Sequence, residues 1–271
     1  LNGGVGILFE QGSARGHLQE NQFGTISFPQ AIRNHFTTSL STLRAVHQMR
    51  GELLSMQNDF YKESLRMAGN DAVKAIVFGS EKDPMRSFHL MDLINQHDIA
   101  IHPVKGFIKK NGKSFAEDSY IVPLNQPQYR LIKSMFEKRT AFQDSLFYDV
   151  STWTLPLAFN LDYAELSAKG YSSSNLGELI SESPTTPKGT VSGNSDYAYI
   201  FEPYGYYTQR AIMRLVEEEV VVEVSHAPHG TSTQTFARGS IVIPVGIQRE
   251  KKEKIDNLVK VIAEEDGIDV Y

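Results

Sequence analysis

Cysteine is missing from this chain of 271 residues, which excludes disulfides, thiolate metal sites and a cysteine nucleophile but leaves the compartment open. Basic charge is scarce as well. The 27 Lys and Arg residues are outnumbered by 32 Asp and Glu, and the net charge of −5 argues against nucleic acid, which needs a dense basic face. No apolar run approaches the ~20 residues that span a bilayer. The remaining composition, 41% hydrophobic and 22% charged, suits one large globular domain or two small ones.

The first 70 residues are predicted to hold one short strand and one long helix. Val5–Phe9 is an apolar run typical of a buried strand, and a loop rich in Gly, Ser, Arg and Asn follows it. Ser27 is suited to cap a helix and Pro29 to its first turn. Apolar residues then recur every three or four positions, which predicts an amphipathic helix bent near Gly51 and ending near Gly69-Asn70. Because the chain opens directly on the strand without a methionine, we expect a fragment of a longer polypeptide.

The rest of the chain repeats one order of elements. Residues 73–140 and residues 196–266 each predict strand, helix, strand, strand and helix, with a hairpin signal at Lys110–Lys113. When the halves are aligned, Ile76-Val77-Phe78 falls on Tyr199-Ile200-Phe201. The further matches are Ile99 and Ile101 with Val222 and Val224, Phe115 with Phe236, and Tyr120–Leu124 with Ile241–Val245.

A shared order of elements is harder to obtain by chance than a few shared residues, although α/β proteins repeat such elements generically. The sequence therefore predicts an α/β fold in which a long N-terminal helix (domain 1–70) precedes an internally duplicated β-α-β-β-α domain (71–271). Strand–helix–strand units favour a mixed sheet with helices packed on it. Duplication also predicts pseudo-two-fold symmetry between the halves.

Two different segments connect the halves. Residues 140–170 contain Trp153 and several other large apolar side chains, so we expect them to pack on the sheet. Residues 171–195 are rich in Ser, Thr, Gly, Pro and Asn, and this composition predicts an exposed, mobile loop.

Glu10 is the first candidate for chemistry, because a carboxylate at the end of a buried strand can act on a group above the sheet edge. The alternative is a strand-end glutamate that faces water. Arg15, in the loop that follows, could bind a substrate carboxylate or could be an ordinary surface arginine. His17 and Glu20 have the His-x-x-Glu spacing of a zinc-binding pair, but they lie in a Gly/Asn-rich loop without a persuasive partner histidine, which favours coincidence.

The amino-terminal region resembles the end of the catalytic domain of zinc metallocarboxypeptidases of the carboxypeptidase A-like family. The resemblance lies in Val5–Gly16, Phe28-Pro29, Ile32-Arg33-Asn34 and Ser39–Leu43, and covers about the first 50 residues. In that family the last core strand ends in a glutamate that acts as general base for a zinc-bound water, and a terminal helix packs on the sheet. The resemblance places the general base on Glu10 and makes residues 71–271 an accessory domain of a large bacterial member.

The resemblance also limits what this chain can do alone. The mechanism needs zinc with three protein ligands and an open position, so that the pKa of the bound water falls towards ~7. The family's ligands precede its general base, whereas only nine residues precede Glu10 here and none is of a ligand type. We therefore expect zinc in the parent protein, no metal and no catalysis in this chain, and, by resemblance, a periplasmic or extracellular location.

Two further groups of side chains invite a functional interpretation. His226 and His229 follow a strand-like run and could converge on a metal, but no carboxylate or cysteine accompanies them at ligand spacing, so a polar loop is favoured. Five tyrosines gather around the start of the second half. Partly buried aromatics at a strand–helix turn explain most of them, although an exposed subset could bind peptide or sugar: Tyr197, Tyr199, Tyr204, Tyr206 and Tyr207.

Two functions thus remain open. The first is a C-terminal piece of a zinc carboxypeptidase-like enzyme, whose partners would be the upstream catalytic domain and, in the parent, a peptide substrate. The second is a binding module with no peptidase history and a cleft between two pseudo-symmetric halves. Self-association through the N-terminal strand is a further possibility, because an unpaired apolar edge invites pairing.

Overall fold

The computed structural model describes residues 3–11, 14, 16–138, 141, 154–180, 184–230 and 234–271. Arg15 and Trp153 lie outside these residues. The chain divides into two compact units: Leu1–Asn70 with Pro127–Leu131, and Asp71–Gln126 with Ile132–Tyr271. In the part of the chain that the structure describes, no helix has both the length and the apolarity that crossing a membrane requires.

The start of the first unit differs from the prediction. Val5–Phe9 forms no strand, and its four large apolar side chains are 43–80% exposed. A strand needs a neighbour to accept and donate its backbone hydrogen bonds, and the described part of this unit provides none beside this segment. The predicted loop instead contains a hairpin, in which β1 (Leu18–Asn21) pairs antiparallel with β2 (Gly24–Ser27).

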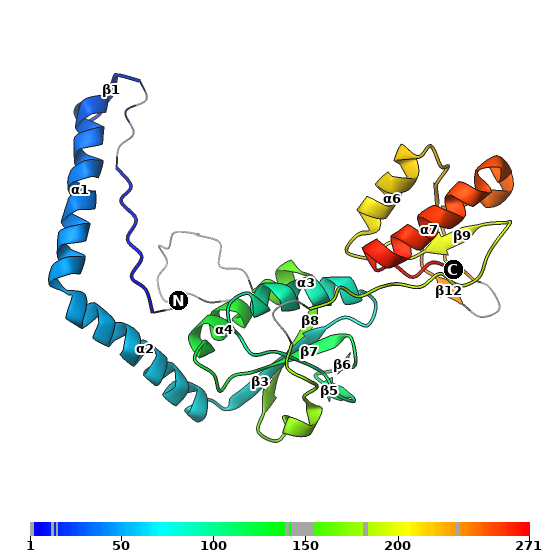
Figure 1. Ribbon diagram of the computed structural model, residues 1–271, viewed down its shortest axis with the longest axis horizontal. Coiled ribbons are helices and arrows are strands. Elements are labelled where there is room, and N and C mark those ends of the chain that lie inside the picture. The colour runs from blue at the N-terminus through cyan, green and yellow to red at the C-terminus, as the bar shows by residue number, and fades with distance from the viewer. Residues whose placement is uncertain are drawn as a thin grey trace. The chain divides into compact units, whose positions relative to one another are not determined.

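The predicted long helix is present as two helices, α1 (Phe28–Gln48) and α2 (Arg50–Asn70), which meet at an angle (Figure 1). Ser27 caps α1 as predicted, since its side chain accepts a hydrogen bond from the backbone N–H of Gln30 at 3.3 Å. The break falls at Met49, whose φ of −96° and ψ of 13° depart from helical values, and not at Gly51. Gly51 lies inside the first turn of α2.

The second unit begins with a lobe that we call the first lobe (residues 71–126 and 132–180). Its sheet has the order β4-β7-β3-β8, and a separate hairpin pairs β5 with β6. The elements are β3 (Val73–Gly79), α3 (Pro84–Asn95), β4 (His102–Pro103), β5 (Ile108–Lys110), β6 (Lys113–Phe115), β7 (Ser119–Pro123), α4 (Tyr129–Phe136), α5 (Leu155–Ala158) and β8 (Asp162–Ser167).

The sheet is antiparallel and not mixed, which corrects the prediction. β3 and β4 do run in the same direction on either side of α3, but β7 lies between them and pairs antiparallel with both. β8 likewise pairs antiparallel with β3 on its other edge. This is the split β-α-β arrangement of ferredoxin-like sheets. Sequence periodicity identifies the strands but cannot reveal that one strand is inserted between two others.

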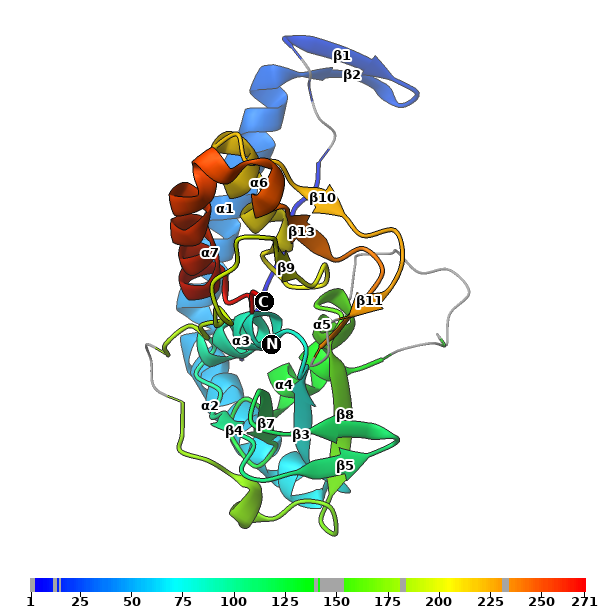
Figure 2. The same cartoon turned by 90° about the vertical axis from the view of Figure 1, so that its right-hand side faces the viewer.

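The second lobe (residues 184–271) has a smaller sheet of order β10-β13-β9, again antiparallel, with α6 and α7 side by side on one face (Figure 2). Tyr271 and Ile200 exchange both backbone hydrogen bonds at 2.9 Å, so the last residues lie on the edge of β9 away from β13. The elements are β9 (Tyr199–Phe201), α6 (Thr208–Glu217), β10 (Glu223–Val224), β11 (His229–Gly230), β12 (Thr235–Phe236), β13 (Ile241–Ile243) and α7 (Lys252–Asp266).

The two lobes share their strand register as well as their element order. Val77 pairs with Ile121 in the first lobe, and the aligned residues Ile200 and Val242 pair in the second. His102 pairs with this same Ile121, and Glu223 with this same Val242. Ile99 and Ile101 therefore correspond to Val220 and Val222, and not to Val222 and Val224 as the alignment predicted.

A buried glutamine holds the approach to the edge strand in each lobe. The side-chain amide of Gln126 accepts from the N–H of Ala100 at 2.7 Å and donates to its carbonyl at 3.1 Å. Gln248 holds the N–H and carbonyl of Val221 in the same way, at 2.9 and 3.0 Å. A residue with a left-handed φ precedes each clamped residue by two positions. It is Asp98 before Ala100, with φ 56°, and Glu219 before Val221, with φ 58°. The sequence predicts strands at Asp98–His102 and Val220–Val224, and these turns explain why β4 and β10 begin later and are shorter.

The segment predicted to be a mobile loop is anchored where it is described. The N–H groups of Gly177, Gly189 and Ser192 donate to backbone carbonyls of Pro103, Ala263 and Val270, at 2.7–2.9 Å. Most of its side chains are nevertheless exposed, as predicted. The apolar segment 140–170 was expected to pack on the sheet. Its strand β8 pairs with β3 and forms an edge of the sheet.

The helices cover only one face of each sheet. In the second lobe, Tyr199 and Phe201 of β9 and Ile241 and Ile243 of β13 are buried against apolar side chains of α6 and α7. The opposite face of the first lobe is also buried, because β5, β6 and the segment after β8 lie over it. On the opposite face of the second lobe, Ala198, Ile200 and Val242 are only partly covered by the residues that the structure describes.

Removing either buried glutamine should destabilise the protein. Gln248→Ala removes both hydrogen bonds to the N–H and carbonyl of Val221, and Gln126→Ala does the same at Ala100. Since one such bond contributes about 0.5–1.5 kcal/mol, each change should cost about 1–3 kcal/mol of unfolding free energy. Urea unfolding measures this loss. Gln209→Ala, an exposed change on α6, is the control and should cost less than about 0.5 kcal/mol. Equal losses of unfolding free energy from Gln248→Ala and Gln209→Ala would contradict a stabilising role for the hydrogen bonds of Gln248.

Candidate functional site

Of the residues singled out at the amino terminus, the structure describes Glu10, His17 and Glu20, and these form no metal-binding group. Glu10 is exposed in a segment without regular structure, and Arg15 lies outside the described residues. His17 and Glu20 are both exposed around the start of β1. Among the residues that the structure describes, no three His, Asp or Glu side chains gather as a metal-binding group. A role for Glu10 thus depends on groups that this unit does not bring to it.

A cavity of about 720 Å³ opens in the second lobe, on the sheet face opposite α6 and α7. Its floor is formed by Ala198 and Ile200 of the β9 segment and by Val242 of β13, which alternate with the buried residues of the helix-covered face. Phe236 and Tyr271 add aromatic walls. An apolar floor with a few polar groups at the rim is the usual composition of a binding pocket.

A serine and a histidine contact one another at the rim of this cavity. The Oγ of Ser225 lies 2.9 Å from Nδ1 of His229, and it also donates to the carbonyl of Ala227 at 2.6 Å. A carbonyl can only accept, so the hydroxyl proton points to Ala227 and Nδ1 of His229 must be the donor to Ser225. His229 therefore cannot take the proton of Ser225 in this arrangement. The pair shapes a turn and is not an activated nucleophile.

His229 has a second role in the wall of the cavity. Its ring stacks on Phe236 with centroids 5.4 Å apart and an interplanar angle of 27°. His226, by contrast, is exposed and does not line the cavity. The two histidines therefore do not face the same cavity.

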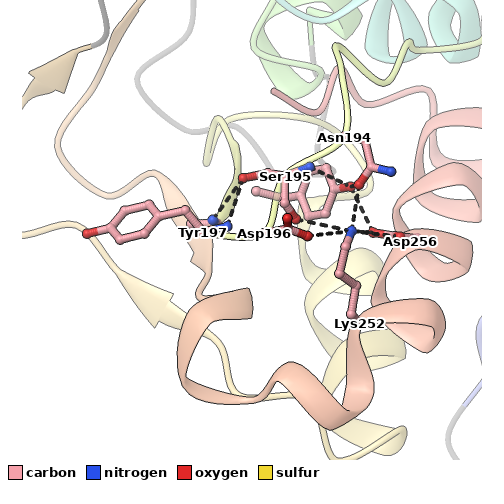
Figure 3. A network of polar contacts seen from close by, with 8 residues as sticks. Asn194, Ser195, Asp196, Tyr197, Lys252 and Asp256 are labelled. Carbon is pink, nitrogen blue, oxygen red and sulfur yellow. Dashed lines mark hydrogen bonds and ion pairs between the residues drawn. The ribbon is translucent and has the colours of Figure 1, made fainter.

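A network around Lys252 fixes the segment that enters β9. Figure 3 shows the amino group of Lys252 between Asn194, Ser195, Asp196 and Asp256. It lies 2.6 Å from the Oδ1 of Asn194 and 2.9 Å from an oxygen of Asp256. The Oγ of Ser195 accepts from the N–H groups of Tyr197 and Ala198, both at 3.1 Å. The network thus ties α7 to the residues that form one side of the cavity.

Ionisation within this network follows from the contacts. The hydrogen bond to Asp256 raises the pKa of Lys252. Burial alone would raise the pKa of Asp256, but the hydrogen bonds from Lys252 and Tyr199 outweigh it and the pKa is lowered. Burial raises the pKa of Tyr199, whose hydroxyl donates to Asp256 at 2.8 Å. A charged Lys252–Asp256 pair with a neutral Tyr199 is a structural tie and not an acid–base pair poised near neutral pH.

The tyrosine cluster divides into several roles. Tyr199 belongs to the core, whereas Tyr197 is 85% exposed at the cavity. Tyr206 and Tyr207 pack edge to face at 4.9 Å, and the guanidinium of Arg210 lies 3.5 Å from the ring centroid of Tyr207. Most of the cluster is therefore structural, and Tyr197 is the member best placed to meet a ligand.

The sequence pointed to Tyr197 and His229, which line the cavity, but not to the other residues of its lining. Glu223 pairs with Val242 and therefore lies on the cavity face. In the sequence it is part of the strand-like run Val220–Val224 and belongs to no recognisable functional motif. Ala198 and Ile200 alternate with Tyr199 and Phe201, a signal that predicts two different faces but not whether the second face is covered.

Asp256→Asn should destabilise the second lobe near neutral pH by about 1 kcal/mol, because it removes the charge that holds Lys252. The folded-state pKa of Asp256 lies below the ordinary value of 3.8. Its stabilising charge is therefore fully present above that value and is lost as the pH falls through the folded pKa. Urea unfolding at pH 7 and pH 3 should show the wild-type advantage shrinking at low pH. The exposed Glu253→Gln should show no such advantage, and an undiminished gap at pH 3 would contradict the assignment.

Comparison with family models, curated proteins and solved structures finds no match to this chain. Its function has to be judged from its own geometry. That geometry offers two surfaces suited to a partner: the cavity of the second lobe, and the apolar side chains exposed along α1.

Proposed function

We propose that this chain is the carboxyl-terminal part of a zinc carboxypeptidase-like peptidase and is non-catalytic by itself. Residues 1–70 would close the peptidase domain, and residues 71–271 would form an α/β accessory domain that binds without cleaving. The observation that carries the proposal is the apolar face of α1, which the described residues leave exposed.

This apolar face extends along the whole of α1. None of the 21 residues of the helix is buried. The side chains of the face are 37–66% exposed: Phe28, Ile32, Phe36, Leu40, Leu43 and Val46. A surface helix normally turns such a stripe towards a core, and a continuous exposed apolar patch marks an interaction surface. A peptidase domain is a fitting partner, because the terminal helix of the resembled family packs on the sheet of that domain.

Glu10 would act in the parent as the general base for a zinc-bound water. The segment Val5–Phe9 would then be the last strand of the upstream sheet, which accounts for an apolar run exposed here without a pairing partner. Zinc and the family's substrate-carboxylate arginine would be supplied by upstream residues, and Arg15 is the candidate in this chain for a contact with the substrate carboxylate. The family resemblance also favours export to the periplasm or the outside.

The accessory domain is best explained by an internal duplication of repeats at about 73–140 and 196–266. Three shared features support it: the element order, the strand register and the glutamine clamps at Gln126 and Gln248. A generic α/β repeat would share the order but would have no reason to share a side-chain clamp at the same place. The expected pseudo-two-fold relation follows from duplication and would appear as superposable lobes.

The alternative is a binding module with no peptidase history. The cavity beside Tyr197, His229 and Phe236 favours it, because its described lining residues all lie in the second lobe, between 192 and 271. A zinc-ligand motif upstream of Leu1 would decide for the peptidase, and its absence for the independent module.

The metal assignment makes a direct prediction. This 271-residue chain should bind no stoichiometric zinc in calorimetric titration and release no C-terminal residue from peptides. In a longer protein with the upstream domain, Glu10→Gln should lower hydrolysis by about 10²-fold or more and keep the zinc, because the glutamate is not a ligand. Glu20→Gln is the matched control and should stay active. A tight zinc site in this chain, or full activity of the longer Glu10→Gln protein, would contradict the role of Glu10.

The α1 assignment makes a second prediction. Phe36→Gln should change the unfolding free energy of this chain by less than about 0.5 kcal/mol, because the side chain is 63% exposed here. In the longer protein the same change should cost about 3 kcal/mol, because it removes a buried aromatic. Thr37→Gln, on the polar side of α1, should be neutral in both. Equal stability of the two longer variants would refute docking of this face on the upstream domain.

A further inference from the structure

The outer edge of β4 in the first lobe is covered by the chain itself. Residues 175–180 run antiparallel beside it, and Leu176 forms a β-bridge with Val104. Three backbone hydrogen bonds of 2.7–3.0 Å join the two: Lys105 N–H to Asn175 O, Gly177 N–H to Pro103 O, and Ile180 N–H to Ile101 O. This segment therefore acts as an added strand of the sheet.

The same segment also covers the sheet face. Leu176 and Tyr171 pack against the buried cluster that includes Ala75, Val77 and Ile121. The face of the sheet opposite the helices is thereby shielded from water. Backbone pairing at the edge and burial of Leu176 on the face are two parts of one interaction.

The equivalent edge of the second lobe, β10, is open. Val224 stands in the place of Pro103, and Val222 in the place of Ile101, by the register of the two sheets. No described residue donates a backbone hydrogen bond to the carbonyl of either valine. Val224 is 53% exposed. An edge with free carbonyls can pair with an added strand.

The face beside this edge is the cavity described above. Ala198, Ile200 and Val242 take the places of Ala75, Val77 and Ile121, and they form its floor instead of a buried core. Each of the three is partly exposed, whereas each counterpart is buried. The cavity is the space that Leu176 and Tyr171 fill in the first lobe.

The charge of the lining side chains further restricts which peptide would bind in the cavity. Among the described residues that line the cavity, Glu223 is the only one with an acidic side chain, and none is a lysine or arginine. Glu223 stands in the place of His102, whose ring lies 3.0 Å from the carbonyl of Gly177. The residue that follows Gly177 is Glu178. A peptide on β10 with a basic residue at that position would face Glu223, whereas an acidic residue would be repelled.

We propose that β10 and the adjacent cavity bind an extended peptide of another protein, which adds a strand to β10. Its apolar side chain enters the cavity opposite Ser225, as Leu176 does opposite Val104, and a basic residue two positions later faces Glu223. The inference rests on the correspondence of the two lobes and is independent of the peptidase assignment.

The test uses the whole 271-residue chain and a fluorescein-labelled decapeptide with the sequence of residues 171–180 carrying Glu178→Lys. Fluorescence anisotropy should show saturable binding. Leu176→Asp in the peptide should weaken binding at least about tenfold, since a charge would enter an apolar cavity. Replacing Gly177 by N-methylglycine should weaken it about tenfold by removing the donor to the carbonyl of Val224.

Protein variants locate the site. Ala198→Leu fills the cavity with an apolar group and should weaken binding about tenfold, whereas the exposed Ala237→Leu should leave it unchanged. Glu223→Lys should reverse the charge preference, favouring the unmodified Glu178 peptide over the lysine peptide by about two- to fivefold. Urea unfolding of each variant separates loss of binding from loss of fold.

The outcomes are distinct. Binding that is lost with N-methylglycine and with Ala198→Leu, and that reverses its preference with Glu223→Lys, supports the peptide site. Binding that survives N-methylation, or that survives Ala198→Leu in a folded variant, overturns it, as does no binding at millimolar peptide. If sedimentation instead shows a dimer that Glu223→Lys alters, the edge pairs with a second copy and the proposal is wrong.

Discussion

The antiparallel pairing of an inserted strand is the interaction on which the second unit depends. β7 lies between β3 and β4, and β13 lies between β9 and β10. The two strands of each strand–helix–strand unit therefore do not pair with each other, and both pair with a strand that follows later in the chain. The edge strand is then short and follows a left-handed turn at Asp98 or Glu219. A buried glutamine supplies the polar partners that the ladder lacks there. Without it, the N–H and carbonyl of Ala100 or Val221 would lose both of these hydrogen bonds.

This arrangement makes the two faces of each sheet unequal. The two longer helices of a lobe lie on one face, because each connects two parallel strands that have one strand between them. In the first lobe α3 joins β3 to β4 across β7, and α4 leads from β7 towards β8 across β3. The other face depends on what else the chain provides. In the first lobe the segment through Leu176 provides a cover, and a continuous core results. In the second lobe the equivalent face holds a cavity bounded by Phe236 and His229. The same fold thus produces a buried face once and an accessible face once.

The helical and turn signals were predictable because they are local. Ser27 and Pro29 placed the start of α1, and the Asn111-Gly112 pair placed the β5–β6 hairpin, where both residues have positive φ as such a turn requires. Val5–Phe9 forms no strand in the described part of this unit, since an apolar run indicates only that a segment can be buried. Whether it is buried depends on neighbours elsewhere in the chain.

The sequence by itself determined the α/β class, the order of the elements, the long amphipathic helix and the resemblance between the two halves, because periodicity and turn chemistry act over a few residues. Only the tertiary structure decided three features. These are the antiparallel strand order, the hydrogen bonds from glutamine side chains to the backbone before each edge strand, and which sheet face stays open. These depend on contacts between distant residues, such as Gln248 with Val221 and Leu176 with Val104. Alternation along β9 places Ala198 and Ile200 on one face, but only the absence of a covering segment there, among the described residues, turns that face into a cavity.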